Sequence, residues 1–182
     1  MSKLYPIIYL SLFFLITSCD NQQLDKTLND NILKAKQIPL EDFFKNPERS
    51  SYQISPNGDY YSFMAPYKSR MNIFIQKRGD TSSVQLTFEE DRDVAGYFWP
   101  NDNQIMFLKD DGGDENYHLF GVEIDGSNLI SYTDFEGVRA QIIDDLPDQD
   151  GFVVIGLNKR NKQVFDPYRL NLSSGELTMI AE

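Results

Sequence analysis

One short stretch of the sequence, residues 110–115, carries four carboxylates around a pair of glycines: Asp110, Asp111, Asp114 and Glu115. Oxygen ligands at this density could bind a divalent cation. A calcium loop of the EF-hand type, however, needs its ligands at alternating positions around a central glycine and a distal glutamate. The spacing here does not follow that pattern, so we interpret these carboxylates as formers of turns and salt bridges. We predict no metal site and no cofactor in this chain.

Nucleophilic catalysis needs a different set of side chains. A serine hydrolase places a nucleophile, a histidine base and an orienting acid in one pocket. The sequence holds a single histidine, His118, and no Gly-x-Ser-x-Gly nucleophile elbow. His118 lies in a predicted strand, where a histidine hydrogen-bonded to its local surroundings is the simpler interpretation. We therefore predict no catalytic residue within these 182 residues.

The charge balance excludes one large class of partners. Asp and Glu number 28 against 17 Lys and Arg, for a formal net charge of −11. Binding the polyanionic backbone of nucleic acid takes clustered lysine and arginine, so we expect no nucleic-acid partner. At 41% hydrophobic and 13% aromatic residues, the chain is rich enough in apolar side chains to bury a core.

The N-terminus has the pattern of a secretory signal. Lys3 precedes the apolar run Tyr5–Ile16, which is too short to span a bilayer comfortably. The order Leu15-Ile16-Thr17-Ser18-Cys19 resembles a bacterial lipobox, in which the cysteine becomes the lipidated first residue. We therefore expect a lipoprotein signal peptide over residues 1–18 and lipidation of Cys19. The alternative is an ordinary signal peptide in which Cys19 is incidental.

Lipidation at this position sets the expected location of the protein. A polar segment, residues 19–37, would tether the folded part to a bacterial membrane, on the periplasmic side or at the cell surface. Cys19 is the only cysteine, so no intramolecular disulfide is possible.

Beyond the tether, two turn signals recur with a common period. The first is Pro56-Asn57-Gly58, repeated at Pro100 and Pro147, at spacings of 44 and 47 residues. The second contains Gly79, Gly126 and Gly175, which are 47 and 49 residues apart. Each signal borders strands rich in β-branched and aromatic residues. We interpret the charged run Glu89–Asp93 as a solvated connection.

A period in the mid-forties with about four short strands per unit is typical of β-propeller blades. We predict an all-β, partial propeller with about three four-stranded blades, roughly at 50–90, 93–135 and 137–182, preceded by a short helix. Known rings take about four to eight blades, so we expect Glu182 to end a fragment. A compact three-bladed form or an open array of sheets is the competing interpretation.

Two segments are distinctive beyond their turns and strands. One is Ile38-Pro39-Leu40-Glu41-Asp42-Phe43-Phe44-Lys45-Asn46-Pro47-Glu48, followed by Tyr52-Gln53-Ile54-Ser55-Pro56-Asn57-Gly58. The other is Asp110-Asp111-Gly112-Gly113-Asp114-Glu115-Asn116-Tyr117-His118-Leu119. Together they resemble the propeller of the prolyl oligopeptidase family of serine peptidases, in its acylaminoacyl-peptidase-like and dipeptidyl-peptidase-like branch. The resemblance covers about residues 38–182.

This resemblance implies a two-domain serine peptidase whose propeller caps a C-terminal α/β-hydrolase domain with a Ser-Asp-His triad. In that family the propeller limits access to short peptides and can help hold the N-terminal end of the substrate. By the same resemblance, Asp114 and Glu115 are candidates for contact with a substrate amine or with the hydrolase domain. The hydrolase domain is not in these 182 residues, so we expect the chain by itself to be inactive.

A second function class stays open, that of a non-enzymatic binding propeller of the TolB-like kind, which uses similar turns. A nucleophile elbow encoded beyond residue 182 would distinguish the peptidase from the binding propeller.

Overall fold

A computed structural model describes residues 37–182, in two units that are treated separately. In the first unit, a single turn of 3₁₀ helix, η1 (Leu40–Phe43), follows Pro39. Glu41 and Asp42 lie in this turn, where acidic side chains suit the positive end of the helix dipole. A short helix thus precedes the strands, as expected. Within residues 37–182, no helix is long and apolar enough to cross a membrane. The predicted signal peptide, Cys19 and nearly all of the tether lie outside the described residues.

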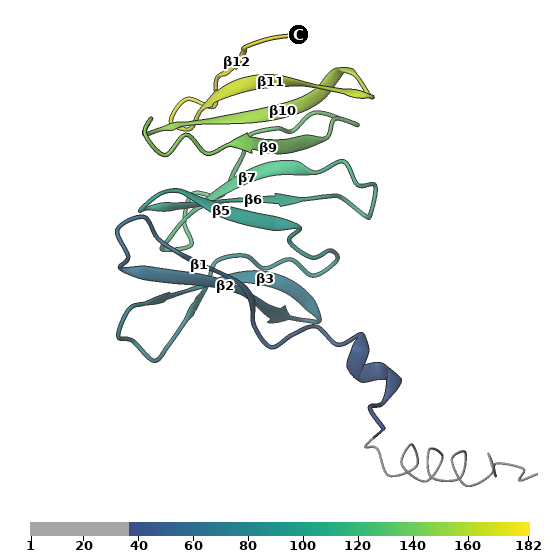
Figure 1. The fold of residues 1–182 in the computed structure, drawn as a ribbon, viewed down its shortest axis with the longest axis vertical. Helices are drawn as coiled ribbons and strands as arrows, with labels where there is room; N and C mark the ends of the chain where they lie inside the picture. The colour runs from purple at the N-terminus through teal and green to yellow at the C-terminus, as the bar shows by residue number, and fades with distance from the viewer. Residues whose placement is uncertain (1–36) are drawn as a thin grey trace, which may run out of the picture. The chain divides into compact units, whose positions relative to one another are not determined.

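The second unit, residues 45–182, consists of three antiparallel sheets of four strands each (Figure 1). Blade 1 contains β1 (Ser50–Ile54), β2 (Tyr60–Tyr67), β3 (Arg70–Lys77) and β4 (Val84–Gln85). Blade 2 contains β5 (Gly96–Asn101), β6 (Gln104–Lys109), β7 (His118–Glu123) and β8 (Ile130–Ser131). Blade 3 contains β9 (Ala140–Asp144), β10 (Phe152–Asn161), β11 (Val164–Asn171) and β12 (Leu177–Met179). The strands of each blade pair in sequence order, which confirms the predicted all-β partial propeller.

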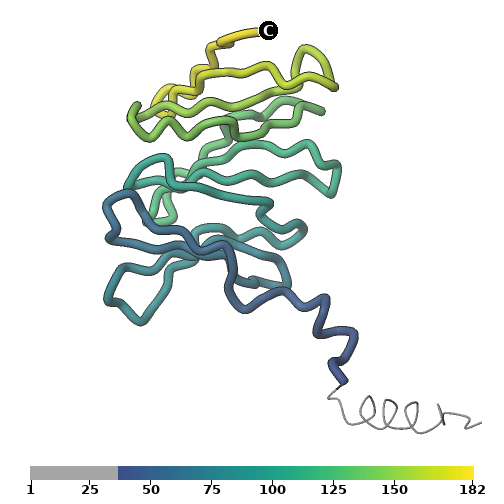
Figure 2. Tube along the Cα trace, in the orientation of Figure 1, coloured from purple at the N-terminus to yellow at the C-terminus, as the bar shows by residue number. Residues whose placement is uncertain are grey.

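Blade 2 lies between the other two blades, as the chain trace shows (Figure 2). On its second strand β6, Ile105 and Phe107 belong to the core shared with blade 1, whereas Met106 belongs to the core shared with blade 3. On β7, Val122 belongs to the core shared with blade 1, whereas Leu119 belongs to the core shared with blade 3. Successive side chains of a strand point to opposite faces, so a strand between two sheets needs apolar residues throughout.

The predicted turns form at their glycines. Gly58 and Gly126 have φ of +73° and +82°, in the left-handed region that favours residues without a Cβ. The N–H of Gly126 donates to the carbonyl of Glu123 at 2.9 Å, which closes the turn after β7. These turns depend on local sequence alone, which is why the spacing of the glycines revealed the repeat.

The last strand of each blade is short. β4 and β8 have two residues each and β12 has three. The pairing continues past β4 as a single bond, from the N–H of Leu86 to the carbonyl of Ile73 at 2.9 Å.

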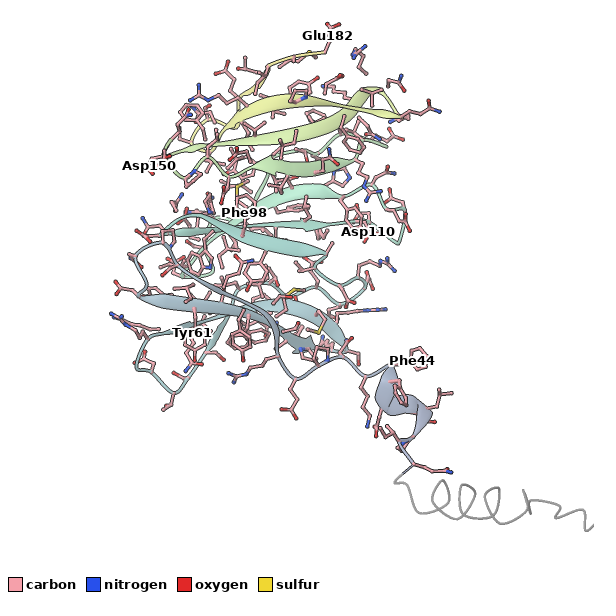
Figure 3. The ribbon with its side chains drawn as sticks, in the orientation of Figure 1. Phe44, Tyr61, Phe98, Asp110, Asp150 and Glu182 are labelled. Atoms are coloured by element: carbon pink, nitrogen blue, oxygen red, sulfur yellow. The ribbon has the colours of Figure 1, made fainter. Side chains whose placement is uncertain are left out.

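Antiparallel order places the loops of the blades at two rims. The connections between the second and third strands lie at one rim, together with the connections that lead from one blade to the next. The turns between the first and second strands lie at the other rim. Asp110 and Asp150 mark the two rims (Figure 3).

Candidate functional site

The carboxylate-rich stretch forms the connection between β6 and β7, residues 110–117, which we call the rim loop. Asp110 anchors it: the residue is only 4% exposed, and one carboxylate oxygen accepts a hydrogen bond from Arg92 Nε at 3.2 Å. The other oxygen accepts the backbone N–H of Glu115 at 3.2 Å. The hydrogen bond to Asp110 raises the pKa of Arg92. Because Arg92 belongs to the connection between blades 1 and 2, this ion pair fastens the rim loop to that connection.

The backbone of the rim loop turns back on itself through left-handed residues. Gly112 and Gly113 have φ of +57° and +89°, and a Cβ at Gly113 would lie 3.4 Å from a terminal nitrogen of Arg92. Glu115 adopts φ of +59° in spite of its Cβ. The hydrogen bond from its N–H to Asp110 holds it in this conformation. The shape of the loop therefore depends on Asp110 as much as on its glycines.

Asp114 makes its hydrogen bonds inside the loop. Its two carboxylate oxygens accept the backbone N–H of Asn116 at 3.0 Å and the side-chain Nδ2 of Asn116 at 2.8 Å. These bonds, the side-chain bond foremost, lower the pKa of Asp114. Among residues 37–182, the Glu115 carboxylate has no hydrogen bond or ion pair. Next to the internally bonded Asp114, the loop thus presents Glu115 as a carboxylate that is open to a partner, and Asp111 is a second exposed carboxylate of the loop.

Asp114 and Glu115, the two predicted contact residues, are both exposed at the rim. Their contact with a substrate amine or a second domain stays a prediction. His118 lies in β7 with Nδ1 2.5 Å from the carbonyl oxygen of Thr133, to which it donates. The hydroxyl of Thr133 accepts the N–H of Leu119 at 2.7 Å. His118 is therefore hydrogen-bonded to the neighbouring backbone, as expected.

The far end of the rim loop reaches the start of blade 3. The carbonyl of Tyr117 accepts the N–H of Ala140 at 2.8 Å, and the guanidinium of Arg139 lies 5.0 Å from the centroid of the Tyr117 ring. With Arg92 at its other end, the loop touches the connections on both sides of blade 2. It is therefore a point on this rim where parts of three blades meet.

Sequence reasoning missed Arg92. The run Glu89–Asp93 predicted a solvated connection, but four of its side chains bind other parts of the chain. Glu90 pairs with Lys68, in the turn between β2 and β3, at 2.6 Å. Glu89 pairs with Lys109 at 3.0 Å, and the Asp93 carboxylate accepts the N–H of Met71 at 2.8 Å. Arg92 and Asp110 are 18 positions apart, and only the antiparallel order of the blade brings them together. No periodicity in the sequence could have signalled that contact.

The geometry limits the chemistry that the rim loop can perform. Within residues 37–182, no group of three or more His, Cys, Asp or Glu side chains could hold a metal ion. Asp110 is paired with Arg92, and Asp114 is bonded to Asn116, so two of the four carboxylates already have donors. The remaining acceptors suit the recognition of a cationic or hydrogen-bonding group, and not the breaking of a covalent bond.

Replacing Asn116 with alanine should raise the pKa of Asp114 toward its ordinary value. The side-chain donor is the largest cause of the lowered pKa, while the backbone N–H of residue 116 remains as a smaller one. Carbon-detected NMR titration of the carboxyl groups measures the shift. Asp125 is the internal control, because its pKa is lowered by Ser127 in a different turn. An unchanged Asp114 titration would contradict this account of the loop.

No family model matches the chain. The chain is 32% identical over 153 residues to dipeptidyl aminopeptidase BIII of Pseudoxanthomonas mexicana, in a match that covers 83% of this chain and 22% of that protein. The chain spans about a fifth of the length of the curated relatives it matches.

Solved structures agree on the fold. A TolB from Agrobacterium tumefaciens superposes with a TM-score of 0.53 at 16% identity, covering 80% of this chain and 50% of that one. The acylaminoacyl peptidase of Pyrococcus horikoshii gives a TM-score of 0.52 at 14% identity, covering 75% of this chain and 25% of that one. Identities this low show the propeller fold alone. The sequence match to a dipeptidyl aminopeptidase, carried on blades of this fold, shows that the chain is a propeller portion of the prolyl oligopeptidase family.

Proposed function

We propose that this chain is the substrate-gating propeller portion of an exported serine peptidase that cleaves short peptides. The observation that carries the proposal is the 32% identity, over 153 residues, to a protein named as a dipeptidyl aminopeptidase. The catalytic α/β-hydrolase domain of such a peptidase lies outside these 182 residues. The chain contributes the blades that restrict access to the catalytic pocket, and the intact protein takes short peptides.

The rim loop supplies the contact with the substrate or with the catalytic domain. Glu115 presents an exposed carboxylate without an ion pair among the described residues, and Asp110 and Arg92 hold the backbone beneath it. A carboxylate held in this way accepts hydrogen bonds from an ammonium group or from backbone N–H groups of a facing domain.

The proposal includes a lipid anchor at Cys19, supported by the lipobox-like order of residues 15–19. An anchored peptidase would act on peptides outside the cytoplasm, on the periplasmic side of a membrane or at the cell surface. Cys19→Ser should then move the protein from the membrane fraction to the soluble fraction and abolish its labelling with a palmitate analogue. Unchanged fractionation and labelling would contradict the anchor.

The peptidase proposal is tested on the protein as its own gene encodes it. An affinity tag inserted at residues 80–83, an exposed segment between β3 and β4, leaves both ends of the gene untouched. The isolated protein should react with a fluorophosphonate probe of serine nucleophiles and should release dipeptides from short peptides with a free N-terminus. A protein that neither reacts nor hydrolyses would overturn the proposal.

The role of Glu115 is tested by a substitution at that residue, measured in the same peptidase assay. Glu115→Gln should lower kcat/KM for peptides with a free N-terminus by about tenfold, the effect of losing one charge-assisted hydrogen bond of about 1.4 kcal/mol. Asp111→Asn is the matched control, because Asp111 is an exposed carboxylate of the same loop. Equal effects of the two substitutions would show that only the charge of the loop matters.

A non-enzymatic binding propeller is the second candidate. The structural match to a TolB supports it, since that match covers half of the neighbouring chain. In this case the protein isolated from its own gene would carry further blades, would not react with fluorophosphonate, and would have no peptidase activity.

A further inference from the structure

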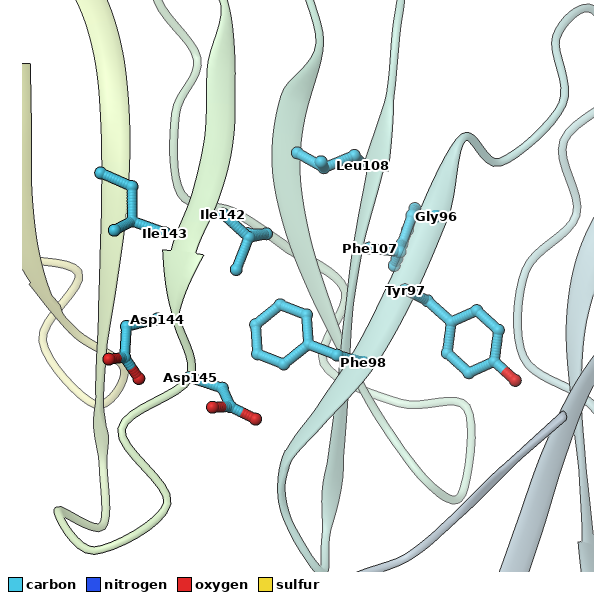
Figure 4. Close-up of a pocket in the computed structure, with 9 residues that line it drawn as sticks. All are labelled: Gly96, Tyr97, Phe98, Phe107, Leu108, Ile142, Ile143, Asp144 and Asp145. Carbon is cyan, nitrogen blue, oxygen red and sulfur yellow. The ribbon is translucent and has the colours of Figure 1, made fainter. Parts of the chain in front are cut away.

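A pocket of about 400 Å³ lies between blade 2 and blade 3, beside their first strands β5 and β9. Its walls are largely apolar, with Phe98 and Leu108 from blade 2 and Ile142 and Ile143 from blade 3 (Figure 4). Binding sites for small molecules have volumes of roughly 300–1,000 Å³. The pocket is therefore large enough for a small organic group.

The corresponding place between blades 1 and 2 is filled. Tyr97 and Trp99 of β5 are buried there, and Trp99 Nε1 donates to the Ser62 hydroxyl at 2.8 Å. By register, Ile142 of β9 is the counterpart of Tyr97, and after the bulge Asp144 takes the position of Phe98, so that Asp145 follows where Trp99 follows Phe98. Smaller side chains thus replace two aromatic rings at this interface. The open volume is the direct result of that replacement.

Two carboxylates, Asp144 and Asp145, line the same pocket. One oxygen of Asp144 accepts the N–H of Leu146 at 2.8 Å, which leaves its other oxygen open. Neither carboxylate forms an ion pair with any residue in the described range 37–182. Figure 4 shows the Asp145 carboxylate toward the ring of Phe98, whereas the Asp144 carboxylate points to the other side of β9, next to Ile143. The pocket therefore combines apolar walls with one carboxylate directed into it and a second at its edge, and no ion pair within residues 37–182 balances either charge.

We propose that this pocket binds an organic cation, an ammonium or guanidinium group carried on an apolar stem. The carboxylates attract the charge, the ring of Phe98 adds cation–π attraction, and the aliphatic walls accept the stem. A bare calcium ion does not fit, because it takes six to eight oxygen ligands and two carboxylates between isoleucines cannot supply them. The proposal concerns this chain alone and stands whether or not the intact protein is a peptidase.

Phenethylamine and its neutral analogue 2-phenylethanol form a matched pair of probes. NMR titration of the 182-residue chain, read at the methyl groups of Ile142 and Ile143, should show the cation binding about tenfold more tightly. High salt should reduce that preference, because it screens exposed charges. Equal affinity of the two probes would overturn the proposal, as would shifts confined to residues outside the pocket.

Paired variants identify the groups responsible. The double variant Asp144→Asn with Asp145→Asn should abolish the preference for the cation, while an asparagine oxygen can still accept the N–H of Leu146. The control Asp148→Asn with Asp150→Asn removes two exposed charges from the same connection, outside this pocket, and should keep the preference. A cation preference that survives in the first variant would refute the assignment.

Peptide probes then distinguish two sources of the cation. Phe-Leu-amide presents an N-terminal ammonium, and acetyl-Phe-Arg-amide presents a basic side chain. Tighter binding of either one, relative to neutral acetyl-Phe-Leu-amide, supports the site and names its source. If neither binds more tightly than the neutral peptide, the pocket does not recognise peptide cations and the proposal is overturned for peptides.

Discussion

Replacing Phe107 with alanine should lower the free energy of unfolding by about 3–5 kcal/mol. Phe107 is 1% exposed and belongs to the core between blades 1 and 2. Its ring stacks on that of Phe120, with centroids 5.4 Å apart. Truncation removes buried apolar surface and leaves a cavity that neighbouring strands, fixed by their hydrogen bonds, cannot fill. Urea unfolding followed by tryptophan fluorescence measures the loss, because Trp99 lies in the same core.

Phe88→Ala is the matched control for that experiment. Phe88 is 61% exposed and makes an edge-to-face contact with Tyr67. The same chemical deletion should therefore cost less than about 1 kcal/mol. Similar losses at Phe88 and Phe107 would mean that the core between blades 1 and 2 does not carry the stability of the chain.

Gly121→Ala should destabilise the chain by about 1–3 kcal/mol, although it adds a single methyl group. A Cβ at this position would lie 2.8 Å from Cε2 of Tyr132 and 2.9 Å from Nε2 of Gln104. Tyr132 cannot move aside freely, because its hydroxyl donates to the carbonyl of Leu172 at 2.9 Å. That bond connects blade 2 with blade 3. Urea unfolding gives the loss of stability, and amide exchange of blade 3 shows whether the two blades have loosened.

Gly96→Ala provides the control, because it adds the same methyl group to another strand glycine of blade 2. Nothing lies within 4 Å of a Cβ at Gly96, and its φ is outside the left-handed region. Alanine there should be neutral or stabilising by up to about 1 kcal/mol, since glycine loses more backbone entropy on folding. A loss at Gly96 as large as at Gly121 would show that backbone conformation, and not the clash with Tyr132, is responsible.

Gly121 also shows how far sequence reasoning extends. Alternation along β7 places Leu119 and Gly121 on one face and Phe120 and Val122 on the other. It did not predict why position 121 is a glycine. The reason is a side chain from the connection after β8, and the repeat pattern contains no information about that contact.

In the rim loop, too, some features were predicted from the sequence and others were revealed only by the structure. The carboxylates of the acidic stretch were interpreted from the sequence as formers of turns and salt bridges, and Asp114 and Glu115 were named from the family resemblance as candidate contact residues. That Asp110 is buried against Arg92, and so differs from its neighbour Asp111, followed only from the structure. Whether a carboxylate is structural or available depends on the cation beside it, and that cation comes from a distant part of the chain.

The sequence by itself determined the strands, the turns and the number of blades. Those features depend on local physics: alternation of side chains along a strand, and glycines where φ must be positive. Only the tertiary structure decided which residues meet between blades. Phe98 and Asp145 are 47 positions apart, yet they line one pocket, because two sheets face each other where smaller side chains replace aromatic rings. Contacts between sheets depend on the shapes of both surfaces, and a periodic pattern in one strand does not specify them.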